Sequence, residues 1–299
     1  WTLSRGLGDV YKRQCSCRGT AGFAHVSCLA EQAKILVAEV EENNLDDKVL
    51  TERFNRWSTC GLCEQDHHGA VRCALGWACW KTYVARPETD PARLMAMPQL
   101  GAGLHEVGRH EEELSVREAD LATMRRLGAP EANLLCAQGN LANTYDMLGR
   151  VEEALNLYRD VYSGELILYG MAHVQTMISA SNYVDSLLLL DRFEEAKSLL
   201  CTVRPVARRV LGESHPLTLR LRWNYASSLY LDSGATLDDL REAVTTLEDG
   251  ERIARQVLGG THPLTTGIEK SIQNVQAELA ARDGDDASSV CEAVRKAKV

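Results

Sequence analysis

The sequence repeats one motif three times: NLANTY at 140–145, NYVDSL at 182–187 and NYASSL at 224–229. Each copy begins forty-two residues after the previous one. The similarity continues downstream, since GRVEEAL at 149–155 matches DRFEEAK at 191–197 at the same spacing. A fixed period of this length predicts a stacked solenoid, in which a single repeat cannot bury its apolar face alone.

Each repeat has the pattern of two helices joined by a short turn. In the second repeat, apolar residues recur at helical spacing on both sides of Gly149 and Arg150. They are Leu141, Tyr145, Leu148, Ala154, Tyr158 and Val161. We therefore expect a mainly α fold in which each repeat is a helical hairpin.

We expect about four such repeats between residues 93 and 282, with periods of 42 to 47 residues. The first repeat, 93–135, is weaker, because Glu113 stands where the next two repeats carry Ala154 and Ala196. A stripe of Ile268, Ile272, Val275 and Leu279 predicts a terminal helix that closes the solenoid. The acidic stretch RDGDDASS and the residues after it, 283–299, are expected to form a linker and tail.

These helical hairpins resemble tetratricopeptide (TPR) repeats. The period and the HPLT joints at His215 and His262 resemble the kinesin light chain type in particular, over roughly residues 93–270. Proline after each of these histidines suits the first turn of a helix, where a missing N–H is not needed. We therefore expect both histidines to cap helices rather than to bind a metal.

The resemblance implies that a partner binds in the concave groove made by the first helix of each pair. The groove residues it implies are Asn140, Asn143, Asn182, Asp185, Asn224 and Ser227. Asparagine offers a donor and an acceptor to the backbone of an extended peptide. Alternatively, Asn140, Asn182 and Asn224 bridge neighbouring repeats. Only Arg220 supplies a cation there, which disfavours acidic ligands and C-terminal carboxylates.

Cysteines are concentrated near the N-terminus, where seven of the ten lie between Cys15 and Cys79. Zinc takes four nitrogen or sulfur donors, and short C-x-C or C-x2-C turns supply two thiolates each. Such donors are present as Cys15, Cys17, His25, Cys28, Cys60 and Cys63. The alternative is that these are core cysteines, the interpretation we favour for Cys73 and Cys79.

The spacing of these donors resembles the RING-CH (RING-variant) zinc finger. The resemblance implies one Zn²⁺ held by Cys15, Cys17, Cys60 and Cys63, and half of a second site at His25 and Cys28. The first cysteine pair of the family pattern is missing and would precede Cys15. Between the pairs, apolar spacing predicts two short helices, 29–40 and 45–57, within a zinc module over 15–86.

Composition limits the remaining possibilities. The 299-residue chain has a net charge of -9, which argues against a nucleic-acid partner because no basic face is available. No apolar run is long enough to span a membrane, and no secretory segment is evident, so we expect a cytoplasmic protein. The stretch DVYKRQ at 9–14 resembles a translated transposon end, and we treat 1–14 as a cloning scar.

Two functions fit these features. The first is a protein–protein interaction scaffold that binds a protein or peptide, because no catalytic constellation is present. The second, implied by the RING-CH resemblance, is a ubiquitin ligase that positions a ubiquitin-conjugating enzyme, with Leu62 and Leu29 supplying the apolar contact. In that case the TPR array would select the substrate.

Overall fold

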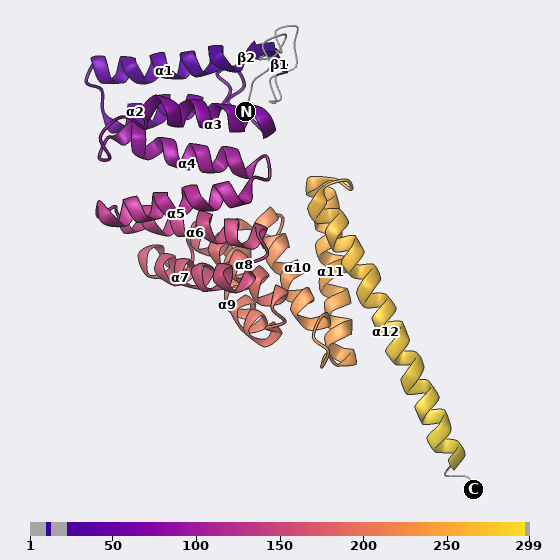
Figure 1. The fold of residues 1–299 in the computed structure, drawn as a ribbon. Coiled ribbons are helices and arrows are strands. Elements are labelled where there is room, and N and C mark those ends of the chain that lie inside the picture. The colour runs from indigo at the N-terminus through magenta and orange to yellow at the C-terminus, as the bar shows by residue number, and fades with distance from the viewer. Residues whose placement is uncertain (1–9, 13–22, 297–299) are drawn as a thin grey trace. The chain divides into compact units, whose positions relative to one another are not determined.

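The computed structural model describes the backbone of residues 10–12 and 23–296, and the side chains of residues 25–282. The chain folds as two compact units that divide between Gly149 and Arg150 (Figure 1). We call them the N-terminal unit and the C-terminal unit. Cys15, Cys17 and most of the expected scar lie outside the described residues.

The N-terminal unit consists mainly of helices. It begins with strands β1 (Val10–Lys12) and β2 (Phe23–His25), which pair antiparallel with Val10 opposite His25. The helices that follow are α1 (Val26–Glu42), α2 (Asp47–Phe54), the 3-10 helix η1 (Asn55–Trp57), α3 (Gly69–Tyr83), α4 (Pro91–His105), α5 (His110–Arg126) and α6 (Glu131–Met147). From α3 to α6, each helix packs against the next.

The two short helices expected between the cysteine pairs are present as α1 and α2. They are separated at Asn43 and Asn44, and Asn44 has a positive φ of 48°, a conformation that asparagine tolerates. The Asp46 carboxylate caps α2 by accepting a hydrogen bond from the Val49 N–H at 2.9 Å. Local turn and cap chemistry therefore fixes this part of the chain.

An aromatic core holds α1, α2 and α3 together. Trp57 packs edge-on against Tyr83 with ring centroids 6.0 Å apart, and Phe54 lies 5.7 Å from the same ring. Cys79 is fully buried in this cluster and Cys73 is buried beside α4, as predicted for both. Burial raises the pKa of the Cys79 thiol, because the thiolate would lose its hydration.

The C-terminal unit is a series of helical hairpins. Its helices are α7 (Val151–Tyr169), α8 (Val174–Leu189), α9 (Phe193–Leu211), α10 (Pro216–Tyr230), α11 (Leu237–Leu258) and α12 (Pro263–Lys296). Each packs against the next, and α10 also packs against α8 and α12. The helices α8, α10 and α12 thus lie side by side as one layer, which is the arrangement expected of the first helices of TPR hairpins.

The joints between hairpins are built from glycine and histidine. Gly170, Gly212 and Gly259 have φ angles of 77°, 89° and 90°, which side chains rarely allow. After them, Nδ1 of His215 accepts from the Leu217 N–H at 3.1 Å, and His262 makes the equivalent bond to Leu264. The prediction that both histidines cap helices is confirmed.

The terminal helix extends further than expected. Helix α12 continues to Lys296, through most of the stretch expected as an acidic linker and tail. Alanine, glutamate, arginine and lysine after the glycine of this stretch favour helix, although the glycine, aspartate and serine residues among them do not. Within the described residues, no helix combines the length and apolar character that a membrane span requires.

Candidate functional site

The expected groove residues of the C-terminal unit lie on two neighbouring first helices. Asn182 and Asp185 are half-buried on α8, whereas Asn224 and Ser227 are buried on α10. The Asn224 side-chain amide donates to the Asp185 carboxylate at 2.7 Å. Asn224 therefore bridges neighbouring repeats, which was the alternative to a role in binding the partner.

The Asp185 carboxylate also neutralises the one cation expected in this groove. Arg220 on α10 forms an ion pair with Asp185, and both side chains are partly exposed. A peptide carboxylate would have to compete with Asp185 for this guanidinium. The arrangement therefore disfavours acidic ligands, in agreement with the sequence.

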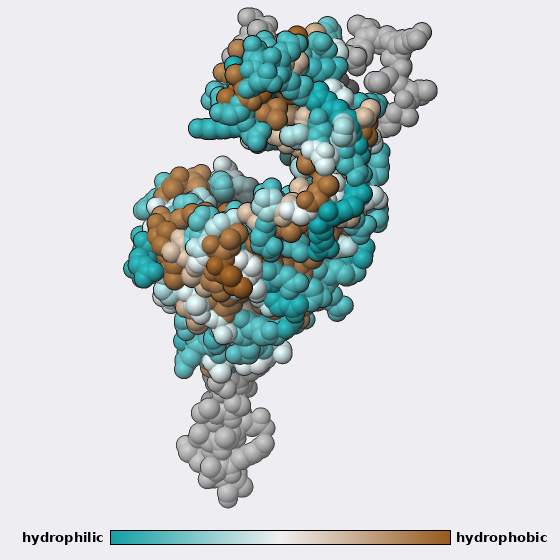
Figure 2. Space-filling model, turned by 90° about the vertical axis from the view of Figure 1, so that its left-hand side faces the viewer, coloured by the Kyte–Doolittle hydropathy of each residue, from teal (hydrophilic) through white to brown (hydrophobic). Residues whose placement is uncertain are grey.

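Large apolar side chains are exposed near the C-terminal ends of the same two helices. Leu189 on α8 is 63% exposed and Leu231, directly after α10, is 49% exposed. Figure 2 shows brown hydrophobic patches among hydrophilic residues on one face of the molecule, without identifying these two leucines. Exposed leucines provide apolar contact area for a partner.

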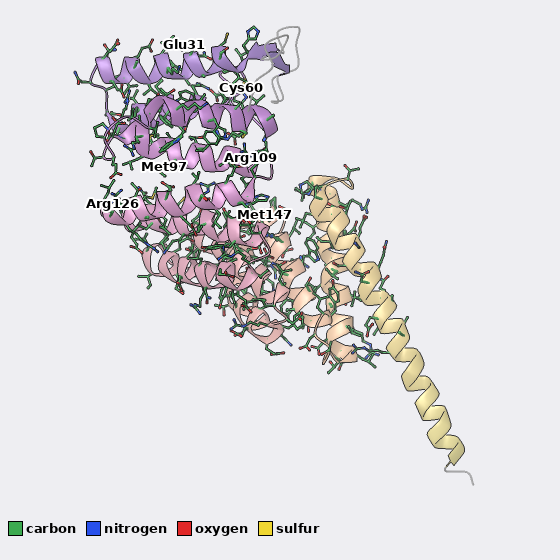
Figure 3. The ribbon with its side chains drawn as sticks, viewed as in Figure 1. Glu31, Cys60, Met97, Arg109, Arg126 and Met147 are labelled. Atoms are coloured by element: carbon green, nitrogen blue, oxygen red, sulfur yellow. The ribbon has the colours of Figure 1, made fainter. Side chains whose placement is uncertain are left out.

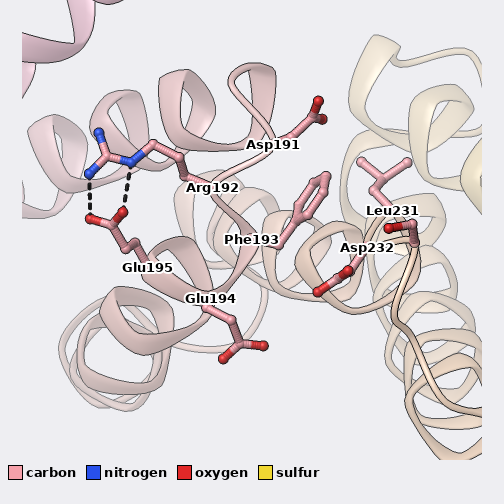
Figure 4. A pocket seen from close by; sticks show the side chains of 8 residues that line it. Asp191, Arg192, Phe193, Glu194, Glu195, Leu231 and Asp232 are labelled. Carbon is pink, nitrogen blue, oxygen red and sulfur yellow. Dashed lines mark hydrogen bonds and ion pairs between the residues drawn. The ribbon is translucent and has the colours of Figure 1, made fainter.

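One of these leucines, Leu231, lines an acidic cavity. It has a volume of about 420 Å³ and is lined by Asp191, Arg192, Phe193, Glu194, Glu195, Leu231, Asp232 and Ser233 (Figure 4). Arg192 forms two 2.7 Å hydrogen bonds to Glu195, so its charge is neutralised. The Phe193 ring lies between Asp191 and Asp232 (Figure 4). Carboxylates around an aromatic face suit a lysine or arginine side chain.

The other two expected groove residues lie in the N-terminal unit. Asn140 is half-buried and Asn143 is exposed, both on α6. They line a cavity of about 260 Å³ together with Asp66, His67, His68, Arg72, Ala102, His105, Glu106, Glu113 and Arg117. The structure thus brings this predicted pair into one cavity, among charged residues and histidines that the sequence analysis did not single out for it.

One face of α5 buries three charged side chains. Glu113, Arg117 and Asp120 are 1%, 6% and 2% exposed. The Glu113 carboxylate lies 3.1 Å from Nδ1 of both His105 and His110, and 3.5 Å from Arg117 Nε. Burial raises the pKa of Asp120 to about 6, because the ionised carboxylate is poorly hydrated there.

Helix α4 leaves room for this charged face. A Cβ atom at Gly101 would come within 2.7 Å of the Arg117 guanidinium carbon, so the guanidinium lies directly on the α4 backbone. Arg109, labelled in Figure 3, lies in the turn that joins α4 to α5. Close approach of the two helices therefore depends on a glycine opposite a buried arginine.

The Cys60–Cys63 pair forms a tight turn in the N-terminal unit (Cys60 is labelled in Figure 3). The Cys60 N–H donates to the Gln65 carbonyl at 2.8 Å, and the Glu64 N–H donates to the Cys60 carbonyl at 2.9 Å. Glu64 has a positive φ of 57°. The backbone from Cys60 to Gln65 thus forms a closed turn that carries both cysteines of the pair, and zinc knuckles also carry C-x2-C pairs on tight turns.

The other expected half-site is also brought together. Cys28 Sγ lies 3.9 Å from His25 Nδ1 at the start of α1, and both residues are exposed. A thiol and an imidazole at this separation fit zinc chemistry. The remaining expected ligands, Cys15 and Cys17, lie outside the described residues, so the four-cysteine site stays a prediction.

Several residues were missed by sequence reasoning. Phe193 carries no distinctive signal, since an aromatic residue at the start of a helix is ordinary. Glu113 did carry a signal in the sequence, because it places a carboxylate where the next two repeats have alanine. His105 and His110 flank a hairpin turn, and their spacing around it could have been recognised once that turn was assigned.

Comparisons with known proteins support the helical-repeat fold. The tetratricopeptide repeat family model matches residues 137–164, which lie in α6 and α7. A comparison with curated proteins finds no match. The chain thus contains TPR sequence, and the helical hairpins on either side of that match have the same pattern.

Two solved structures illustrate the likeness. Nearly identical TPR-like repeats of a Podosopora anserina protein described as a putative kinesin light chain align with 20% identity and a TM-score of 0.52, covering 78% of this chain and 97% of that one. BtubC (BKLC) from P. vanneervenii aligns with 15% identity and a TM-score of 0.51, covering 91% and 93%. At these identities the likeness concerns the fold alone.

Proposed function

We propose that this chain is a protein–protein interaction scaffold that binds an extended segment of a partner protein along α8 and α10. The single observation that carries the proposal is the acidic cavity around Phe193 beside the exposed Leu189 and Leu231. A segment with a basic residue next to apolar ones complements both features.

Backbone recognition would come from the polar residues of the same layer. Asn182 is half-buried on α8, where its amide can pair with an extended backbone. Asn224 is engaged with Asp185, so we assign it to holding the two helices in register. We keep Asn140 and Asn143 as contacts of the N-terminal unit with a partner.

Charge favours a basic partner over an acidic one. The chain has a net charge of -9, and Arg192 and Arg220 both form ion pairs with neighbouring carboxylates. Complementary charge raises the rate of encounter and excludes partners of the wrong sign. Binding of the partner should therefore weaken as the salt concentration rises.

The proposal is tested with a library of extended peptides presented to the full chain. Peptides that combine lysine or arginine with leucine should bind best. Glu194→Lys should weaken their binding about tenfold, which corresponds to about 1.4 kcal/mol, while Glu152→Lys on α7 serves as the matched control. Equal binding by both variants, or a preference for acidic peptides, would contradict the proposal.

Apolar contact is tested separately. Leu189→Ser should weaken peptide binding, whereas Val257→Ser, a change at a side chain on α11 that is 53% exposed, should not. If instead Val257→Ser alone weakens binding, the partner occupies a different face of the unit.

We also propose that Cys60 and Cys63 hold a zinc ion together with Cys15 and Cys17. The closed turn with two thiols supports this assignment, and Cys60 is 2% exposed. Bound zinc would supply a cross-link that stabilises residues 15–86 as a module. The double variant Cys60→Ser/Cys63→Ser should lose one zinc per chain by elemental analysis, and the control Cys201→Ser should lose none.

A second candidate function, a RING-CH-type ubiquitin ligase, is favoured by one observation. Leu62 stands between the two cysteines and is 71% exposed, where it could contact a ubiquitin-conjugating enzyme. The proposed zinc module would then position that enzyme while the repeats select the substrate. Ubiquitination with a panel of purified conjugating enzymes, lost on Leu62→Ala but kept on Leu45→Ala, would establish it. Inactivity with every enzyme would exclude it.

A further inference from the structure

A buried carboxylate occupies an unusual position in the first hairpin. Glu113 on α5 corresponds to Ala154 and Ala196 in the next two repeats, and both alanines are fully buried. Its own side chain is 2% exposed. A carboxylate removed from water needs compensating partners, because its desolvation otherwise costs several kcal/mol.

Two imidazoles converge on this carboxylate. His105 is the last residue of α4 and His110 the first of α5, so the hairpin turn brings them together. Both Nδ1 atoms lie 3.1 Å from the same oxygen, Oε2 of Glu113. The centroids of the two rings are 5.4 Å apart and the ring planes are inclined at 65°. One ligand atom from each residue lies within 4.8 Å of the other two.

These separations suit a metal ion. Zinc binds histidine nitrogen and carboxylate oxygen at about 2.0–2.1 Å, so neighbouring donors of a tetrahedral site lie about 3.3 Å apart. The observed separations of 3.1 Å need only a small adjustment to admit an ion. Arg117 forms an ion pair with the other carboxylate oxygen, Oε1, at 3.5 Å, and so places a positive charge beside the carboxylate.

The cluster is accessible to an ion and leaves a coordination position open. The side chains of His105 and His110 are 37% and 22% exposed. His105 and Glu113 also line the cavity of about 260 Å³ in the N-terminal unit, with Glu106 in the same wall. Water or a side chain of a partner could therefore complete a site with three protein ligands.

We propose that His105, His110 and Glu113 bind a first-row divalent transition-metal ion of the Zn²⁺ class across the turn between α4 and α5. Two imidazoles and one carboxylate form a donor set that selects such ions over Mg²⁺ and Ca²⁺, which prefer oxygen. The site is separate from the cysteine ligands and does not depend on the proposed scaffold function.

Cobalt binding to the full, metal-stripped chain tests the proposal. Co²⁺ bound by nitrogen and oxygen gives visible ligand-field bands, whereas Co²⁺ bound by cysteine also gives a near-ultraviolet charge-transfer band. His105→Ala/His110→Ala should remove one equivalent of Co²⁺ and part of the visible absorption, and should leave the charge-transfer band unchanged. The control His173→Ser, which keeps a capping side chain at α8, should bind as the unsubstituted chain does.

A second variant distinguishes loss of a metal ligand from a folding defect. Glu113→Gln keeps the size and hydrogen-bonding capacity of the buried side chain and removes its negative charge, so it should fold but should weaken binding of the same equivalent at least tenfold. Unchanged stoichiometry and spectrum in both variants would overturn the proposal. Loss of the charge-transfer band together with the visible bands would also overturn it, because the ion would then belong to the cysteines.

Discussion

Helices α5 and α9 occupy the same place in their hairpins but bury opposite chemistry. Besides the buried Leu114 and Leu121, α5 buries Glu113, Arg117 and Asp120, and in α9 the positions that correspond to these three hold Ala196, Leu200 and Val203. Both sets are nearly inaccessible to water. The repeat geometry therefore accepts either an apolar or a charged face, and the difference lies in what each face contributes.

The apolar face of α9 stabilises its unit directly. Leu200 and Val203 are fully buried in the cluster that runs from Leu155 to Val275. The charged face of α5 lies instead beside a cavity and needs His105 and His110 as partners. A buried charge network is weak evidence for stability, so we interpret α5 as the helix that carries a site.

Among the variants that test this comparison, Leu200→Ala should cause the largest loss of unfolding free energy. Removing a fully buried leucine side chain leaves a cavity and costs about 2–5 kcal/mol of unfolding free energy. Chemical denaturation of the full chain, followed by circular dichroism, measures the loss. A cost below about 1 kcal/mol would mean that α9 does not pack as described.

Asp120 should make the stability contribution of the charged face of α5 depend on pH. Its folded-state pKa of about 6 lies above its ordinary value of 3.8, so between these values the folded state binds the proton more tightly than the unfolded state. Stability from this residue is therefore complete below pH ~4 and is lost as pH rises through ~6, by about 3 kcal/mol in total.

Asp120→Asn should remove that dependence. The unfolding free energies of the variant and the original chain are measured by chemical denaturation from pH 4 to pH 8. Because asparagine does not titrate, the variant should gain stability relative to the original chain as pH rises. A constant difference over this range would contradict the assignment.

Replacing the charged face with that of α9 tests the comparison as a whole. The triple variant Glu113→Ala/Arg117→Leu/Asp120→Val should raise stability at pH 7 by about 1–4 kcal/mol, as replacing buried ion pairs with apolar residues often does. It should also abolish the proposed metal site. A large loss of stability would show that the charged face is itself the structural core of the hairpin.

The smallest effect concerns the joint that follows the apolar helix α9. His215→Ala removes the acceptor for the Leu217 N–H at the start of α10 and should cost about 1 kcal/mol. His215→Ser should recover most of that loss, because serine caps the same position. Thermal unfolding measures both, and equal melting temperatures for the two variants would exclude a capping role.

Much of the fold could be predicted from the sequence because the deciding interactions are local. Apolar spacing located α1 and α2, and the repeated motif located the hairpins. The histidine caps were also predictable, since each acts on an N–H two residues away. The run of α12 past Arg282 was not expected, because the acidic stretch RDGDDASS was interpreted as a solvated linker.

The candidate sites depended on contacts that sequence spacing does not specify. Arg220 and Asn224 meet Asp185 across 35 and 39 residues. Burial of Glu113 requires His105 on the preceding helix, and no periodic pattern requires a histidine there. Groove positions could therefore be named from the repeat register, but the partners of each side chain could not.

Hydrogen–deuterium exchange of the full chain, with and without the tightest-binding basic–apolar peptide, tests the central claim most directly. If the chain binds its partner along the first helices, amides of α8, of α10 and of the first turn of α9, which lines the acidic cavity, will be protected, while those of α11 and of the rest of α9 are unchanged. Protection confined to α11 and to α9 beyond its first turn, at a peptide concentration that saturates binding, would contradict the account.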